Sequence, residues 1–239
     1  YFTAATKIMM ITMSISSSLG AVIMPRTSNL IAEGRMDEFR ILIQKSYDFV
    51  LALAMPLTVG LIFTSPSIIL LLSGEGFAPA VLTSQIVASN ILMVGLSGVM
   101  GIQVLYPLGK INIVILCTLI GAAVNVFFNV LLIPRYGHNG TAVAYMLAEV
   151  AVTVSMFLIG RKYIPIQFLK KQHLHYVGGG IVMGGVLYFI SLLGLSIIST
   201  LITMICVGIM VYIIVLLWLK DSIGMVILSI VWRKMKCRC

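Results

Sequence analysis

The chain is a succession of long apolar runs separated by short polar segments. Each run comes close to the roughly 20 residues that a helix needs to cross the hydrocarbon core of a membrane. The short alternating segments typical of a transmembrane β-barrel do not occur in it. The pattern predicts an all-α, polytopic membrane protein with about seven transmembrane helices, over residues 8–24, 49–72, 80–105, 111–133, 141–160, 176–193 and 198–219.

Composition supports a membrane location. Hydrophobic residues make up 60% of the chain and charged residues 10%, and the mean hydropathy is +1.13. A soluble domain of 239 residues needs a more polar exterior than this composition provides. The last apolar segment, residues 223–232, is too short to cross a bilayer and is followed by basic residues. It predicts a helix that lies along the membrane interface.

The distribution of basic residues predicts the orientation in the membrane. The net charge of +9 would suggest a nucleic-acid partner in a soluble protein, but here the basic residues fall at the ends of apolar runs, and we expect no nucleic acid to bind. When the segment after the first run is placed in the cytoplasm, all 16 Lys and Arg residues except Lys7 and Arg135 lie in cytoplasmic segments. The positive-inside rule therefore predicts a cytoplasmic C-terminus.

Outside the apolar runs, the titratable residues suggest no catalytic or metal site. His138, His173 and His175 are expected in solvated loops, and the last two lack a third metal ligand nearby in sequence. We therefore expect neither a metal ion nor a cofactor. Asp48 follows Lys45 by three residues, a spacing that predicts a local ion pair at the membrane surface.

Three segments carry a resemblance to a known family. They read LGAVIMPRTSNLIAEG over residues 19–34, AMPLTVGL followed by LSGEGFAPA within residues 54–80, and LIPRYGHNGTAVA over residues 132–144. In this order and spacing they resemble the C-terminal half of polysaccharide (Wzx-type) flippases, which are relatives of the peptidoglycan lipid II flippase and of the multidrug and toxin exporters. The resemblance implies a two-lobed transporter of which this chain is a part. Residues 1–172 would form second-lobe helices, 173–220 a terminal helical hairpin and 221–239 a cytoplasmic interfacial tail.

The resemblance also implies a function. Such a flippase moves a lipid-diphosphate-linked oligosaccharide to the outer leaflet of the bacterial cytoplasmic membrane for surface polysaccharide such as O-antigen, by alternating access. The implied partners are this substrate, membrane lipid, a coupling ion (a proton or sodium), and the glycan polymerase and glycosyltransferases of the pathway. Two alternatives stay open: a cation-coupled multidrug or small-molecule exporter, and a non-transporting membrane subunit or truncated product. An enzyme is not expected, because the short outer connections hold neither paired carboxylates nor a nucleophile with a base.

Polar residues inside the apolar runs are the candidate substrate-binding groups. Lys7, Ser14 and Ser18 fall on one face of the first predicted helix. The resemblance places basic residues near Lys7, where an ammonium group would attract a diphosphate; the alternative is that Lys7 extends to the membrane surface. Amides can bind sugar hydroxyls or join two helices, and those inside the runs are Gln85, Asn90, Asn125 and Asn129.

Two further residues have an open interpretation. Glu149 is the only charged residue within the run 141–160, and a buried carboxylate must be paired, protonated or hydrated. It is a candidate for coupling transport to an ion, or for a structural hydrogen bond to a neighbouring helix. Pro56 removes a backbone donor within a predicted span, and it marks either a hinge or a static kink.

Overall fold

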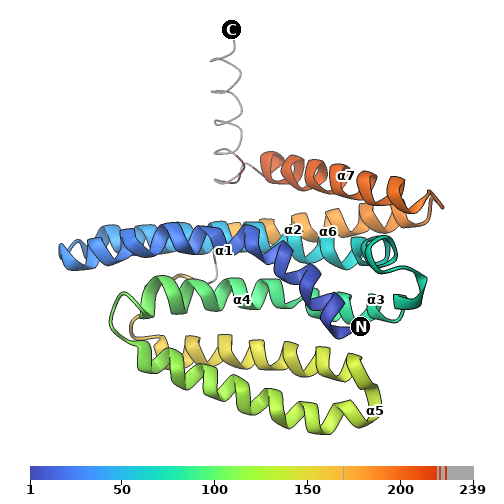
Figure 1. Ribbon diagram of the computed structural model, residues 1–239. Helices are drawn as coiled ribbons and strands as arrows, with labels where there is room; N and C mark the ends of the chain where they lie inside the picture. The colour runs from blue at the N-terminus through green and yellow to red at the C-terminus, as the bar shows by residue number, and fades with distance from the viewer. Residues whose placement is uncertain (169, 220, 222–223, 225–239) are drawn as a thin grey trace.

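The computed structural model describes residues 1–168, 170–219, 221 and 224, with residues 15–19 and 21 described by their backbone alone. The predicted fold class is confirmed, because this part of the chain is helical and contains no strand. The helices run along a common direction as an elongated bundle (Figure 1). They are α1 (Phe2–Ala32), α2 (Met36–Ser73), η1 (Glu75–Phe77), α3 (Ala80–Ala88), α4 (Asn90–Gly98), η2 (Val99–Leu105), α5 (Ile111–Gly160), α6 (Lys171–Ser191) and α7 (Ile197–Trp218).

The helices correspond to the predicted apolar runs. Among the described residues, five helical segments are long and apolar enough to cross a membrane: α2, the α3–α4–η2 segment, α5, α6 and α7. The first run lies within α1, which is outside that count, and the runs 111–133 and 141–160 both belong to α5. The interfacial helix expected over residues 223–232 falls outside the described residues apart from residue 224.

Helix α2 occupies the centre of the bundle. It packs against α1, α3 and α4 on one side and against the α6–α7 pair on the other. Its cytoplasmic half, in the predicted orientation, buries Phe39, Ile43 and Tyr47, and these side chains belong to the same apolar cluster as Met100 and Val104 of η2. A second apolar cluster joins α1, α2 and α3. The 38 residues of α2 therefore link the helices before and after it in the sequence.

Helix α5 is two antiparallel arms joined by a tight reversal. Gly137 has φ 54° and ψ −129°, which interrupts the helical backbone just after Pro134, and the two arms run back along each other (Figure 1). Gly121 of the first arm lies against the side chain of Val152 in the second, so a larger residue would push the arms apart. The two arms contain the predicted runs 111–133 and 141–160, with the reversal at Gly137 between them.

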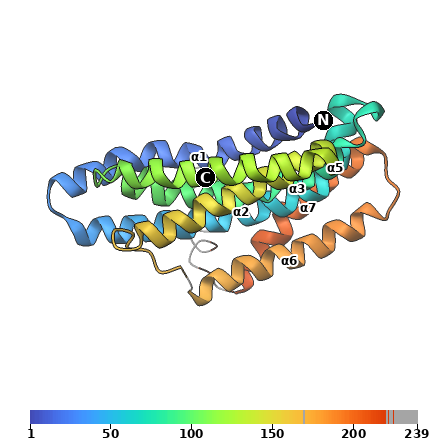
Figure 2. The ribbon, with the colours of Figure 1, turned by 90° about the horizontal axis from the view of Figure 1, so that it is seen from below.

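Connections gather at the two ends of the bundle. At one end lie the N-terminus, η1, the tip of α5 and the α6–α7 turn (Figure 2), where the ring of Tyr1 packs against Phe77 and His138. At the other end lie the α1–α2, η2–α5 and α5–α6 connections. There the Arg35 guanidinium donates to Glu33 and Glu38 at 2.7 Å, and these carboxylates raise the pKa of Arg35 above its ordinary value.

The reversal in α5 makes Gly140 sensitive to substitution. A Cβ at this position would lie 2.6 Å from the carbonyl oxygen of Leu132, a backbone atom that cannot move aside without opening the reversal. We expect Gly140→Ala to lower the free energy of unfolding by about 1–3 kcal/mol, measured as reversible denaturation in detergent micelles. The matched control is Gly185→Ala in α6, whose Cβ would enter open space. Equal stability of the two variants would contradict the described reversal.

Candidate functional site

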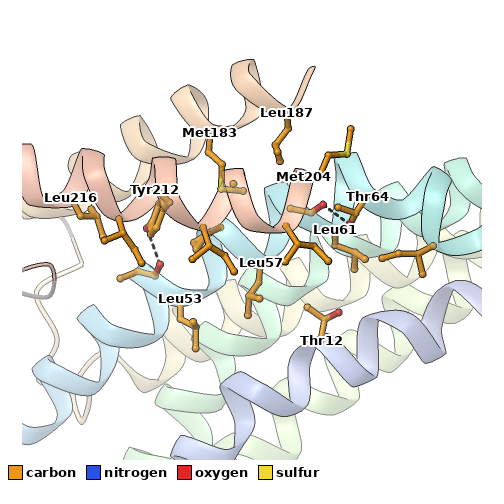
Figure 3. Close-up of a pocket in the computed structure, with 18 of the residues that line it drawn as sticks. Thr12, Leu53, Leu57, Leu61, Thr64, Met183, Leu187, Met204, Tyr212 and Leu216 are labelled. Carbon is orange, nitrogen blue, oxygen red and sulfur yellow. Dashed lines mark hydrogen bonds between the residues drawn. The ribbon is translucent and has the colours of Figure 1, made fainter. Parts of the chain in front are cut away.

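A groove runs along the bundle between α1, α2, α6 and α7, with a volume of about 590 Å³ (Figure 3). Leu53, Leu57 and Leu61 of α2 project into it from successive turns, and Met204 and Tyr212 line it from α7. Nearly all of its lining is aliphatic side chain. Its shape and chemistry suit a long hydrocarbon chain better than a sugar or a metal ion.

The few hydroxyl groups in the groove already donate to backbone carbonyls. Thr12 of α1 and Thr64 of α2 each bond the carbonyl four residues earlier in their own helix, at 3.0 and 2.7 Å. The Tyr212 hydroxyl donates to the carbonyl of Ala52 at 2.8 Å. Because these donors are occupied, the groove wall offers a bound molecule little beyond dispersion contacts.

The two prolines inside α2 account for two of its contacts with other helices. Pro56 has no backbone N–H, so the carbonyl of Ala52, four residues earlier, has no helical donor. The Tyr212 hydroxyl of α7 takes the place of that donor. Pro56 itself lines the groove, and whether it acts as a hinge stays a prediction.

The second proline shows the same arrangement on the opposite side of α2. Pro66 leaves the carbonyl of Ile62 without its helical donor. The side-chain amide of Gln85 in α3 donates to that carbonyl at 3.2 Å, and the Ser65 hydroxyl donates to it at 3.0 Å. The amide of Gln85 therefore joins two helices, which is one of the two roles expected for it.

The other candidate amides lie away from the groove lining. Asn90, at the start of α4, is 0% exposed, and neither of its amide atoms has a hydrogen-bond partner among the described residues. Asn129 and Asn125 lie one turn apart on the first arm of α5, where Nδ2 of Asn129 donates to Oδ1 of Asn125 at 2.9 Å. Both are half-buried. The structure therefore pairs Asn125 with Asn129, and none of the three amides lines the groove.

Glu149 is half-buried on the second arm of α5. The hydroxyl of Tyr145, one turn earlier, lies near its carboxylate. Thr153, one turn later, donates to the Glu149 backbone carbonyl at 2.8 Å and to the carbonyl of Met93 in α4 at 3.1 Å. The carboxylate therefore has a neighbouring donor within its own helix, and its role in ion coupling stays a prediction.

The predicted polar face of the first helix falls partly among the residues whose side chains the structure describes. Lys7 and Ser14 are exposed on α1, and the Ser14 hydroxyl donates to the carbonyl of Ile11 at 2.7 Å. The side chain of Ser18 lies outside the described residues. Because Thr12 of the same helix lines the groove, α1 carries both an exposed polar face and part of the apolar groove.

The predicted partner of Asp48 is wrong. Its carboxylate lies between α2 and the start of α6, 2.9 Å from Nε2 of His173 and 3.3 Å from Nζ of Lys170, and it also accepts from Gln44 at 2.8 Å. A carboxylate can only accept, so Nε2 of His173 carries the proton in this contact. The side chains of Asp48 and His173 are buried. Through Asp48, α2 is connected to residues more than 120 positions later in the chain.

The expected loop position of two histidines is also wrong. Helix α6 begins at Lys171, earlier than its apolar run, so His173 and His175 both lie in its first turns. His175 lies 3.6 Å from the carboxylate of Asp221, which also accepts from Tyr176 at 3.2 Å. In the described part of the chain, no three His, Cys, Asp or Glu side chains lie close enough together to hold a metal ion.

Comparison of the sequence with protein-family models identifies the family of the chain. The model of the family described as lipid II flippase MurJ matches residues 2–216. The chain belongs to the MurJ family.

A solved structure of a MurJ-family protein has the same fold. The lipid II flippase MurJ in its inward closed conformation superimposes with a TM-score of 0.81 at 18% sequence identity, covering 93% of this chain and 47% of that one. At this level of identity the likeness shows the fold alone. The helices described here are thus arranged as in part of a MurJ structure.

Two curated proteins are similar in sequence. A probable low-salt glycan biosynthesis flippase, Agl15 of Haloferax volcanii, is 25% identical over 212 residues, which is 88% of this chain and 45% of the relative. An uncharacterized membrane protein of Methanocaldococcus jannaschii is 26% identical over 155 residues, which is 65% of this chain and 30% of the relative. The chain spans less than half the length of each of these relatives.

The partners of Asp48 can be tested by the stability of two variants, one at Asp48 and one at Lys45. Asp48→Ala leaves Lys170 and His173 without their acceptor, and removal of one partner from a buried pair costs about 3 kcal/mol of unfolding free energy. Lys45→Ala should change it by less than about 0.5 kcal/mol, because Lys45 is exposed. Denaturation in detergent micelles measures both. A larger loss in the Lys45 variant would favour the local pair instead.

Proposed function

We propose that this chain is part of a flippase that moves a lipid-diphosphate-linked oligosaccharide across the cell membrane. The observation that carries the proposal is the apolar groove of about 590 Å³, whose lining includes Thr12 of α1, together with the exposed Lys7 and Ser14 on another face of the same helix. MurJ-family membership and the similarity to a probable glycan biosynthesis flippase support it. The resemblance of the three helix-boundary segments to Wzx-type flippases favours a surface polysaccharide as the product and a bacterial cytoplasmic membrane as the location.

The groove would hold the polyprenyl chain of the substrate. A chain that moves from bilayer hydrocarbon into this groove exchanges one apolar environment for another, so the transfer itself is close to neutral in free energy. The groove therefore orients the lipid more than it adds affinity, through contact with side chains such as Leu57 and Ile209. Selection of the substrate then depends on its diphosphate and sugars.

The exposed face of α1 would receive the polar part of the substrate. Lys7 is exposed on the same helix whose Thr12 lines the groove, so one helix could contact both the diphosphate and the lipid chain. An ammonium group contributes charge without demanding a fixed geometry, which suits a group that must bind and release its ligand. Ser14 adds a hydroxyl on this face.

Transport would follow alternating access between this helical unit and the rest of the transporter. Pro56 would allow α2 to bend during the cycle, and Glu149 would couple the cycle to a proton or sodium gradient through its half-buried carboxylate. The basic residues at the end of the bundle that carries the α1–α2 and α5–α6 connections favour a cytoplasmic position for that end. The C-terminus would then also be cytoplasmic.

Translocation of a fluorescent lipid-diphosphate oligosaccharide by the full-length protein in liposomes tests the function. We expect Ile209→Gln, in the groove wall, to slow translocation about tenfold, because the bound chain would strip water from the amide. Ile214→Gln is the matched control: Ile214 lies on the same helix, is 55% exposed against 57% for Ile209, and lies outside the groove lining. An inactive wild-type protein would refute the function, and equal slowing by both variants would refute the role of the groove.

The role of Lys7 makes a separate prediction. Lys7→Ala should weaken binding of the lipid diphosphate about tenfold while binding of an uncharged polyprenol stays unchanged, because only the diphosphate carries negative charge. Lys7→Arg should retain most of the affinity. Binding can be measured by displacement of a fluorescent lipid from the purified protein. If Lys7→Ala binds both lipids like the wild type, Lys7 does not contact the diphosphate.

A further inference from the structure

A hydrogen bond joins α2 to α7 in the groove wall, and the ring of its donor also packs against α6. Pro56 cannot donate to the carbonyl of Ala52, and the Tyr212 hydroxyl of α7 donates to it at 2.8 Å. Figure 3 shows this bond beside Leu53. The Tyr212 side chain is only 6% exposed, so water has little access to the bond, and α2 and α7 are joined here by a polar contact in apolar surroundings.

Helix α6 fixes the position of the tyrosine ring. A Cβ at Gly179 would lie 3.0 Å from Cε2 and 3.2 Å from Cδ2 of Tyr212. The glycine therefore leaves the space in which the ring packs, and the ring directs its hydroxyl at α2. Any larger residue at this position would displace the ring from Ala52.

We propose that Tyr212 is a positioning residue of the groove, whose hydroxyl replaces the backbone donor that Pro56 lacks and so fixes α7 against α2. The proposal rests on the proposed function of the groove as the site of the polyprenyl chain. Helix α7 cannot move away from α2 without leaving the Ala52 carbonyl unpaired in an apolar environment, which is costly. Any bending of α2 at Pro56 would therefore move α7 and change the width of the groove.

The second proline of α2, Pro66, provides an internal comparison. Its freed carbonyl also receives a side-chain donor, Gln85, but this residue comes from α3 and lies outside the groove lining. The Ser65 hydroxyl shares the same acceptor. Loss of the Gln85 bond therefore should not change the groove, whereas loss of the Tyr212 bond should.

A double-mutant cycle tests the proposal with the full-length protein and a polyprenyl phosphate as the probe. Tyr212→Phe removes one oxygen atom and keeps the ring against Gly179, and we expect it to weaken binding of the probe about 3- to 10-fold. In the Pro56→Ala background the new alanine supplies the backbone donor to Ala52. There the same Tyr212→Phe change should alter the affinity by less than about twofold.

Two controls and one stability measurement separate the outcomes. Gln85→Leu, and Tyr188→Phe at an exposed ring on α6, should leave the affinity for polyprenyl phosphate unchanged. Equal weakening by Tyr212→Phe in both backgrounds would overturn the proposal, as would a lower melting temperature with unchanged affinity. Absence of binding by the wild-type protein would refute the proposed function of the groove, whereas binding that is insensitive to Tyr212→Phe would refute this inference alone.

Discussion

Backbone carbonyls that lose their helical donor must find another one when no water is near, and this requirement organises the centre of the molecule. The two prolines of α2 create two such carbonyls within one helix. A tyrosine from α7 and an amide from α3 satisfy them from opposite sides. Helix α2 is therefore held to α7 and α3 at the points where its own hydrogen bonding is weakest.

Polar and apolar contacts have separate places in the bundle. The charged contacts of Asp48 and Asp221 lie near the start of α6, where Asp48 ties α6 to α2 and Asp221 ties α6 to the segment after α7. In the groove, the hydroxyl groups donate to backbone carbonyls, so the surface that a bound molecule would contact is hydrocarbon. A lipid chain can therefore lie along the bundle without meeting an unpaired polar group from the groove hydroxyls. This separation agrees with the proposal that the lipid and the diphosphate of a substrate contact different parts of the protein.

The sequence predicts the helices well because apolar runs and their proline and glycine boundaries are local features. Partners distant in the chain are not local, and here prediction fails. The spacing of three residues predicts an ion pair between Asp48 and Lys45, whereas in the folded chain His173 and Lys170 lie at the Asp48 carboxylate. The freed carbonyls at Ala52 and Ile62 follow from the positions of the prolines alone. Their donors, Tyr212 and Gln85, could not be chosen among many hydroxyls and amides without the packing of the helices.

The tight reversal at the tip of α5 constrains how the protein is made. The two arms meet at the non-helical Gly137 and pack closely at Gly121. During synthesis the first arm alone would expose its glycine face and its amides to lipid, so the two arms are expected to leave the translocation machinery as one hairpin. Arg135 sits near the tip. If the two arms insert together, the free energy of their packing would offset the cost of moving this charge across the bilayer.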